Sequence, residues 1–252
     1  MYDIIQLSFL TLISACLGSF FNMLIYRLPR EMDIVWKRSH CPKCQHRLSA
    51  IDLIPLLSFL FQKGRCRYCK TRIPFRYFLV ECLTPFIFLI CAFYFQNSFD
   101  FMKYCLFFYI ALLGFFCDFE TKILPNTLTY GLIISGLSLA FIERQGLEHL
   151  QALFICTSIF ILIERLSVAY YKQATFGWGD IKLCAGLAAY WGINITALSM
   201  CIAVILGGIV ATFLLISKKA SRKSYIAFGP FIITASLIVL KYQDQINYYY
   251  GF

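Results

Sequence analysis

Charged side chains are scarce in this sequence. Only 14% of its 252 residues are Asp, Glu, Lys or Arg, whereas 60% are hydrophobic, and the mean hydropathy is +0.71. This composition lies far outside the range of soluble domains. The sequence also lacks low-complexity segments and internal repeats with a period of about 20 to 50 residues, which excludes a repeat array. We therefore predict an all-α polytopic membrane protein.

Eight apolar stretches predict transmembrane helices, because about 20 apolar residues cross roughly 30 Å of hydrocarbon. They cover residues 4–28, 77–95, 101–117, 123–142, 150–170, 181–192, 195–217 and 225–240. The first stretch has no basic segment before it, so we expect it to remain a membrane helix and not to be cleaved as a signal peptide. The stretch at 181–192 spans only about 18 Å as a helix. Backbone near it should be buried in protein or line an aqueous cavity.

Basic residues predict the orientation, because Lys and Arg beside membrane helices stay in the cytoplasm. If both termini lie outside, all but three of the 23 Lys and Arg residues, namely Lys103, Arg144 and Lys241, fall in inner loops. The sequence then divides into a first helix (1–28), a cytoplasmic insert (29–76) and a seven-helix block (77–252). The insert carries most of the net charge of +10. Membrane lipids are the expected partner of these charges, and nucleic acid is the alternative.

Two C-x2-C pairs in the insert predict a structural zinc site, because four thiolates from two tight turns can form a tetrahedron. The pairs are "CPKC" and "CRYC", which supply Cys41, Cys44, Cys66 and Cys69. Disulfides are disfavoured in a cytoplasmic loop, where thiols are kept reduced. The spacing is also compatible with a redox-active C-x-x-C pair, or with metal ligation by the neighbouring His40 or His46.

Carboxylates at membrane depth are costly and therefore point to function. The predicted spans contain Glu81, Asp118, Glu164 and Asp180, all toward the cytoplasmic face. Asp118 ends an inward helix, and Asp180 opens the short helix after two glycines. Two carboxylates within hydrogen-bond reach share a proton, so one can activate water while the other protonates a carbonyl oxygen. The alternative for each is a helix-end acid paired with Lys122 or Lys182, or a helix N-cap.

Several motifs in this order resemble the type IV prepilin peptidases, which belong to the G-x-G-D group of intramembrane aspartyl proteases. The resemblance rests on "GSFFNMLIYRLP" (18–29), "CPKC" (41–44), "IPLLSFLFQKGRCRYC" (54–69), "RYFLVECLT" (76–84), "DFETKILPN" (118–126), "GWGDIKL" (177–183) and "FGP" (228–230). It covers nearly the whole chain.

The resemblance implies a catalytic dyad of Asp118 and Asp180, and zinc bound by the four cysteines. It implies cleavage of the short basic leader of prepilins and pseudopilins at the cytoplasmic face of the bacterial inner membrane. N-methylation of the new N-terminus with S-adenosylmethionine would follow. The sequence shows no Rossmann-type glycine-rich loop. Lys63, Gly64 and Glu81 are therefore only candidates for binding the methyl donor.

Two further classes of function compete with this interpretation. A membrane-anchored zinc module could hold nucleic acid through the basic insert. A proton-coupled transporter could use Asp118 and Asp180 as a relay, although the lack of inverted repeats counts against it. The resemblance favours the peptidase over both.

Overall fold

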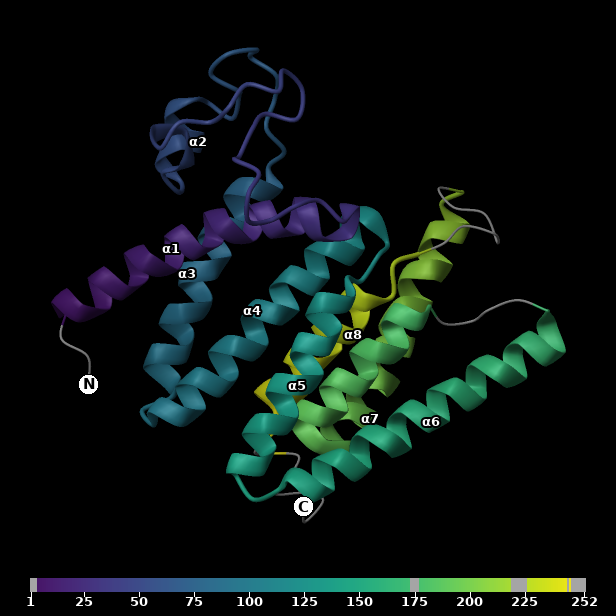
Figure 1. The fold of residues 1–252 in the computed structure, drawn as a ribbon. Helices are drawn as coiled ribbons and strands as arrows, with labels where there is room; N and C mark the ends of the chain where they lie inside the picture. The colour runs from purple at the N-terminus through teal and green to yellow at the C-terminus, as the bar shows by residue number, and fades with distance from the viewer. Residues whose placement is uncertain (1–3, 173–176, 219–225, 244, 246–252) are drawn as a thin grey trace. The chain divides into compact units, whose positions relative to one another are not determined.

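The structure is a computed structural model that describes residues 4–172, 177–218, 226–243 and 245. The described residues form helices joined by loops, with two isolated β-bridges and no strand (Figure 1). Their contacts divide the chain into two compact units, residues 1–113 and 114–252. Helix α4 (Ser98–Thr121) runs from the first unit into the second. The all-helical prediction is confirmed for the described residues.

The first unit contains α1 (Ile4–Arg27), the insert and α3 (Arg76–Tyr94). Small and polar residues on one face of α1 let α1 and α3 approach closely. Ser14 Oγ donates to Thr84 O at 3.2 Å, a Cβ on Gly18 would lie 3.0 Å from Glu81 Cα, and Asn22 Nδ2 donates to Tyr77 O at 2.8 Å. Because lipid is as apolar as leucine, such close packing and interhelical hydrogen bonds hold membrane helices together.

The insert contains three short helices: η1 (Leu28–Arg30), η2 (Ile51–Leu53) and α2 (Leu57–Phe61). Its first loop is fixed by the buried side chain of Arg27. The guanidinium donates to the backbone oxygens of Asp33 (2.9 Å), Lys37 (2.7 Å) and Arg38 (3.2 Å). A buried charge is tolerated where its donors are satisfied in this way.

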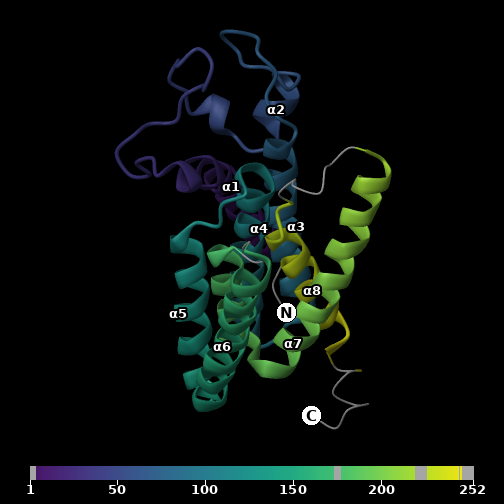
Figure 2. The same ribbon diagram turned by 90° about the vertical axis from the view of Figure 1, so that its right-hand side faces the viewer.

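The second unit contains the end of α4 together with α5 (Asn126–Ile142), α6 (Gly146–Tyr171), α7 (Trp178–Ile216) and α8 (Gly229–Lys241). Helix α7 packs against α5, α6 and α8. It bends sharply into two parts (Figure 2), because Gly192 has the non-helical angles φ 74° and ψ −173°. Glycine adopts a positive φ at little cost. The predicted separation of stretches 181–192 and 195–217 therefore corresponds to this break.

Among the described residues, five helices are long and apolar enough to cross a membrane: α1, α3, α4, α6 and α7. Helices α5 and α8 are apolar but shorter, with 17 and 13 residues. The length and apolar composition of these helices indicate a membrane protein. The count of eight spans stays a prediction, since it depends on α5, α8 and both parts of α7 each crossing the bilayer.

The helix bounds differ from the predicted stretches around the acidic residues. Helix α4 continues to Thr121, past the predicted end of the stretch at residue 117, so Asp118 lies in its last turn. Helix α8 begins at Gly229 with Pro230 next, so this Gly-Pro pair starts the helix and does not kink it. The predicted start of this stretch at residue 225 lies outside the described residues. Proline suits the first turn of a helix because its missing N–H has no intrahelical partner there.

Replacing Gly136 of α5 with alanine should destabilise the second unit. A Cβ at this position would lie 2.9 Å from the backbone of Ala189 and of Tyr190 in α7. Overpacking of this kind costs about 1–3 kcal/mol. Gly131→Ala in the same helix is the matched control, because a Cβ there meets nothing within 4 Å. Thermal unfolding in detergent should show a lower Tm for Gly136→Ala alone; equal Tm values would contradict the close α5–α7 packing.

Candidate active site and candidate metal centre

Asp118 is held by the first residue of α8. Its side chain is 5% exposed, and its Oδ2 accepts a hydrogen bond of 2.9 Å from the backbone N–H of Gly229. The first N–H groups of a helix lack intrahelical partners and carry partial positive charge, so they suit a carboxylate. A Cβ on Gly229 would lie 2.7 Å from the same oxygen. The absence of a side chain at residue 229 therefore makes this contact possible.

Asp180 occupies the third position of α7, after Gly177 at the N-cap. Its Oδ2 accepts the N–H of Gly177 at 3.3 Å, and its own N–H donates to Gly177 O at 3.0 Å. A carboxylate at this position caps the helix by satisfying a free N–H. Lys182, the cation expected to compete for Asp180, donates instead to Asn126 Oδ1 at 2.7 Å. Asp180 thus has a capping role, and it is only partly buried.

Leu124, in the loop between α4 and α5, lies against the N-terminal ends of both α7 and α8. A Cβ on Gly179 would lie 3.1 Å from Leu124 Cβ, and a Cβ on Gly229 would lie 3.3 Å from Leu124 Cδ1. The two helix starts are therefore gathered around one buried leucine. The carboxylates of Asp118 and Asp180 come close enough to interact electrostatically. Such a pair can perform general acid–base chemistry.

The two C-x2-C pairs form turns of the same kind. In the first, Cys41 N–H donates to His46 O (3.0 Å) and Gln45 N–H donates to Cys41 O (2.9 Å). In the second, the equivalent bonds are Cys66 N–H to Thr71 O (2.8 Å) and Lys70 N–H to Cys66 O (3.0 Å). Gln45 and Lys70 share a positive φ, 57° and 58°. Each turn directs two sulfur atoms to one side, as structural zinc sites require.

The four sulfur atoms fit a zinc ion. All lie within 4.8 Å of one another, and Cys41 Sγ and Cys69 Sγ are 3.9 Å apart. A tetrahedral ion with Zn–S bonds of about 2.3 Å places its ligands about 3.8 Å apart. The candidate cluster in the described residues contains these cysteines and neither neighbouring histidine. The ring of His46 packs on Tyr68 with centroids 3.5 Å apart.

The three candidate residues for the methyl donor do not line one pocket. Glu81 is 7% exposed and borders a cavity of about 340 Å³ beside α1, with Asn22, Tyr26, Phe59 and Tyr77 among its neighbours. Its Oε2 accepts the N–H of Leu56 at 2.8 Å. Lys63 lines a different groove, and Gly64 lines neither.

The contribution of Asn22 was missed in the sequence. It is a polar residue inside the first apolar stretch and 2% exposed, which is the signal that could have revealed it. The contact between Glu81 and Leu56 joins residues 25 positions apart. No local pattern reports a contact of that kind.

These features define a helical membrane protein with a pair of carboxylates at two helix starts and a separate four-thiol cluster. Residues 12–95 match the family model described as the bacterial peptidase A24 N-terminal domain, and residues 105–212 match that of the type IV leader peptidase family. The chain belongs to the type IV leader peptidase family.

Curated relatives cover nearly the whole chain. A prepilin leader peptidase/N-methyltransferase of Vibrio cholerae is 32% identical over 255 residues, which is 94% of this chain and 97% of the relative. Proteins of the same name from Aeromonas salmonicida and Bacillus subtilis are 29% and 28% identical over 96% and 97% of this chain, and the matches cover 93% and 98% of those proteins. No solved structure matches the chain. The family resemblance seen in the motifs is confirmed.

The purified full-length chain should contain about one zinc ion, and Cys41→Ser/Cys44→Ser should remove it, because two ligands cannot hold a structural site. Cys16→Ser/Cys201→Ser is the matched control, since both cysteines are exposed and lie outside the cluster. Metal analysis by mass spectrometry gives the stoichiometry. Equal zinc content in the two double variants would rule out the four-cysteine site.

Proposed function

We propose that the protein is an aspartic endopeptidase that removes the short basic leader from type IV prepilins and pseudopilins at the cytoplasmic face of the bacterial inner membrane. The names of the relatives, prepilin leader peptidase/N-methyltransferases, support this substrate class. The observation that carries the chemistry is the convergence of Asp118 and Asp180 at two helix starts packed on Leu124. On this proposal the two aspartates form the catalytic dyad.

The dyad would act by activating water. The ionised carboxylate takes a proton from a water molecule, and the water oxygen adds to the scissile carbonyl carbon. The protonated partner donates a hydrogen bond to the carbonyl oxygen and stabilises the charge that develops there. The tetrahedral species then collapses, the C–N bond breaks, and the proton taken from water passes to the leaving amine. Backbone N–H groups of Gly177 and Gly229 keep both carboxylates oriented during these transfers.

The proposed topology has eight crossings with both termini outside. Residues 1–28 form the first helix, residues 29–76 the cytoplasmic zinc-binding insert linked to methylation, and residues 77–252 the seven-helix peptidase domain. The distribution of Lys and Arg supports this orientation. Prepilin-type substrates and membrane lipids are the proposed partners, and no nucleic acid is expected. Zinc has a structural role, since four thiolates leave no open coordination position.

We further propose that the insert and α1 hold S-adenosylmethionine, which supplies the methyl group for the new N-terminal amine. The 340 Å³ cavity lies in the range of about 300–1,000 Å³ that ligand pockets occupy. Its walls combine the buried carboxylate of Glu81 with the aromatic side chains of Tyr26, Phe59 and Tyr77. A carboxylate complements a cationic sulfonium, and aromatic rings suit a purine and a cation. Lys43 and Arg72 also border the cavity and would suit the carboxylate of the cofactor. The residues present therefore fit this cofactor.

Lys63 and Gly64 have a supporting role in this proposal. Both have positive φ, 52° and 64°, and form the turn after α2. Gly64 N–H donates to Phe59 O at 2.9 Å, and a Cβ on Gly64 would lie 3.1 Å from Phe59 Cζ. The turn therefore sets the position of a ring that lines the cavity. Contact between Lys63 and the cofactor is not required.

Either Asp118→Asn or Asp180→Asn alone should abolish leader removal, with a loss of about 10²- to 10⁴-fold or more, because an amide cannot transfer protons. Glu120→Gln is the matched control, since this exposed acid lies two residues from Asp118. Each variant is co-expressed with a prepilin, and mass spectrometry identifies the N-terminus of the product. Normal processing by either aspartate variant would remove the dyad assignment.

Glu81→Gln should weaken methylation and leave leader cleavage intact, because it removes a buried carboxylate charge from the proposed cofactor cavity. Glu31→Gln, an exposed acid of the same insert, provides the comparison. The mass spectrum of the product reports both activities, since a methyl group adds about 14 Da to a cleaved N-terminus. Binding of S-adenosylhomocysteine by calorimetry gives a second readout. Unchanged methylation and unchanged binding would place the cofactor elsewhere.

A further inference from the structure

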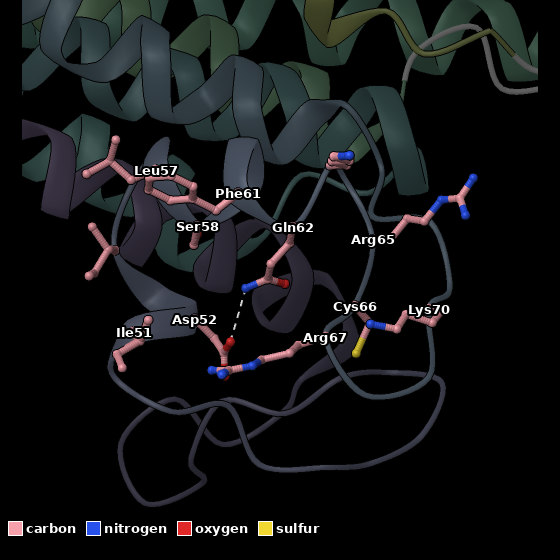
Figure 3. Close-up of a pocket in the computed structure, with 12 residues that line it drawn as sticks. Ile51, Asp52, Leu57, Ser58, Phe61, Gln62, Arg65, Cys66, Arg67 and Lys70 are labelled. Carbon is pink, nitrogen blue, oxygen red and sulfur yellow. Dashed lines mark hydrogen bonds between the residues drawn. The ribbon is translucent and has the colours of Figure 1, made fainter.

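A second feature of the insert is a groove of about 810 Å³ beside α2 (Figure 3). One wall is apolar and includes Ile51, Ile54, Leu57 and Phe61. The other side carries four exposed basic side chains, Lys63, Arg65, Arg67 and Lys70. We call this feature the α2 groove. It is separate from the cavity that contains Glu81, although Asp52, Ser58, Gln62 and Cys66 border both.

The apolar side chains around the α2 groove are strongly exposed. The exposed fractions are 82% for Phe61, 65% for Ile51, 59% for Leu60 and 51% for Leu57. Single exposed apolar residues are common, but a cluster of large ones marks a surface that another apolar phase covers. Such a wall is typical of a surface that contacts a membrane or a binding partner.

Contacts of η2 and α2 place the cluster within the length of the membrane helices. Leu56 N–H donates to Glu81, which lies five residues into α3, about 7.5 Å along its axis. Ser19 Oγ donates to Leu53 O at 3.4 Å, two turns before the end of α1. The rings of Phe59 and Phe78 pack with centroids 5.3 Å apart. Since α1 and α3 are candidate membrane spans, these contacts place α2 beside the ends of two spans, where headgroups would meet acyl chains.

The α2 groove keeps a net positive charge when the negative charge of Asp52 is counted against its four basic residues. Asp52 accepts hydrogen bonds from Ser49 Oγ at 2.7 Å and Gln62 Nε2 at 3.0 Å. Burial alone would raise the pKa of Asp52, but these bonds and the nearby Arg67 lower it below its usual value. Asp52 is therefore ionised at neutral pH and offsets Arg67, whose side chain reaches it in Figure 3. Lys63, Arg65 and Lys70 then remain as a net positive rim.

We infer that the α2 groove binds an anionic phospholipid of the cytoplasmic leaflet, with the headgroup phosphate at Lys63, Arg65 and Lys70 and an acyl chain along Leu57 and Phe61. Anionic lipid attracts basic residues beside membrane helices, and the apolar wall matches a hydrocarbon chain. The phosphates of a nucleic acid would bind the basic side chains of the rim but would leave the apolar wall uncovered. A basic leader peptide would be repelled by the rim. The inference is independent of the proposed peptidase chemistry.

Lipid retention by the full-length chain tests the headgroup contact. Native mass spectrometry in detergent compares phosphatidylglycerol with phosphatidylcholine. Arg65→Gln/Lys70→Gln should weaken phosphatidylglycerol binding by about fivefold for each residue removed, or about 25-fold for both. Lys37→Gln/Arg38→Gln is the control, because it removes the same charge from exposed positions of the insert outside the α2 groove. Retained zinc content shows that each variant is folded.

The acyl contact is tested by Phe61→Trp in nanodiscs. Phosphatidylglycerol with brominated acyl chains should quench the added tryptophan fluorescence relative to the parent chain. Neither excess inorganic phosphate nor a single-stranded oligonucleotide should relieve this quenching. The inference is overturned by equal retention of both lipids, by an unchanged Arg65→Gln/Lys70→Gln variant, or by a lack of quenching. Full displacement of the lipid by phosphate or by the oligonucleotide would show a phosphate or nucleic-acid site instead.

Discussion

Three carboxylates of this protein accept hydrogen bonds from backbone N–H groups, which take the place of water as hydrogen-bond donors. Asp118 accepts the N–H of Gly229, Asp180 that of Gly177, and Glu81 that of Leu56. A charged group in apolar surroundings is tolerated only if such donors are present. Each donor belongs to the start of a helix, α8, α7 or α2. The placement of these three helix starts is therefore the constraint from which both proposed activities derive.

Both units hold a carboxylate at the start of a helix, but the proposed chemistry differs between them. In the second unit, two helix starts bring two acids together, which suits proton transfer. In the first unit, Glu81 and Asp52 border a cavity with aromatic walls, which suits a cationic cofactor. The thiol cluster lies in the first unit, among the turns that carry η2 and α2. A metal there would order the insert around Glu81, whereas the carboxylate pair depends on packing within the other unit.

The sequence predicted features that depend on spacing or on long apolar runs. The C-x2-C pairs predicted a four-thiol cluster, and the short stretch before Gly192 predicted the break in α7. Helix α2 was missed. The apolar run 54–61 is too short for a membrane span, so it was treated as part of a polar insert. The partner of Glu81 was also missed, because only the folded insert brings Leu56 to α3. Lys63 and Gly64 were named only as candidates for the methyl donor, and spacing could not show that Gly64 lies against Phe59.

The position of Leu124 has a mechanical consequence. Its Cδ1 atom lies beside both Gly179, next to Asp180, and Gly229, which binds Asp118. The side chain of Leu124 therefore packs against the start of α7 and the start of α8 at the same time. A larger or smaller side chain at residue 124 would change the distance between the two acids without altering either of them. The geometry of the pair is thus encoded in a residue that has no polar atom in its side chain.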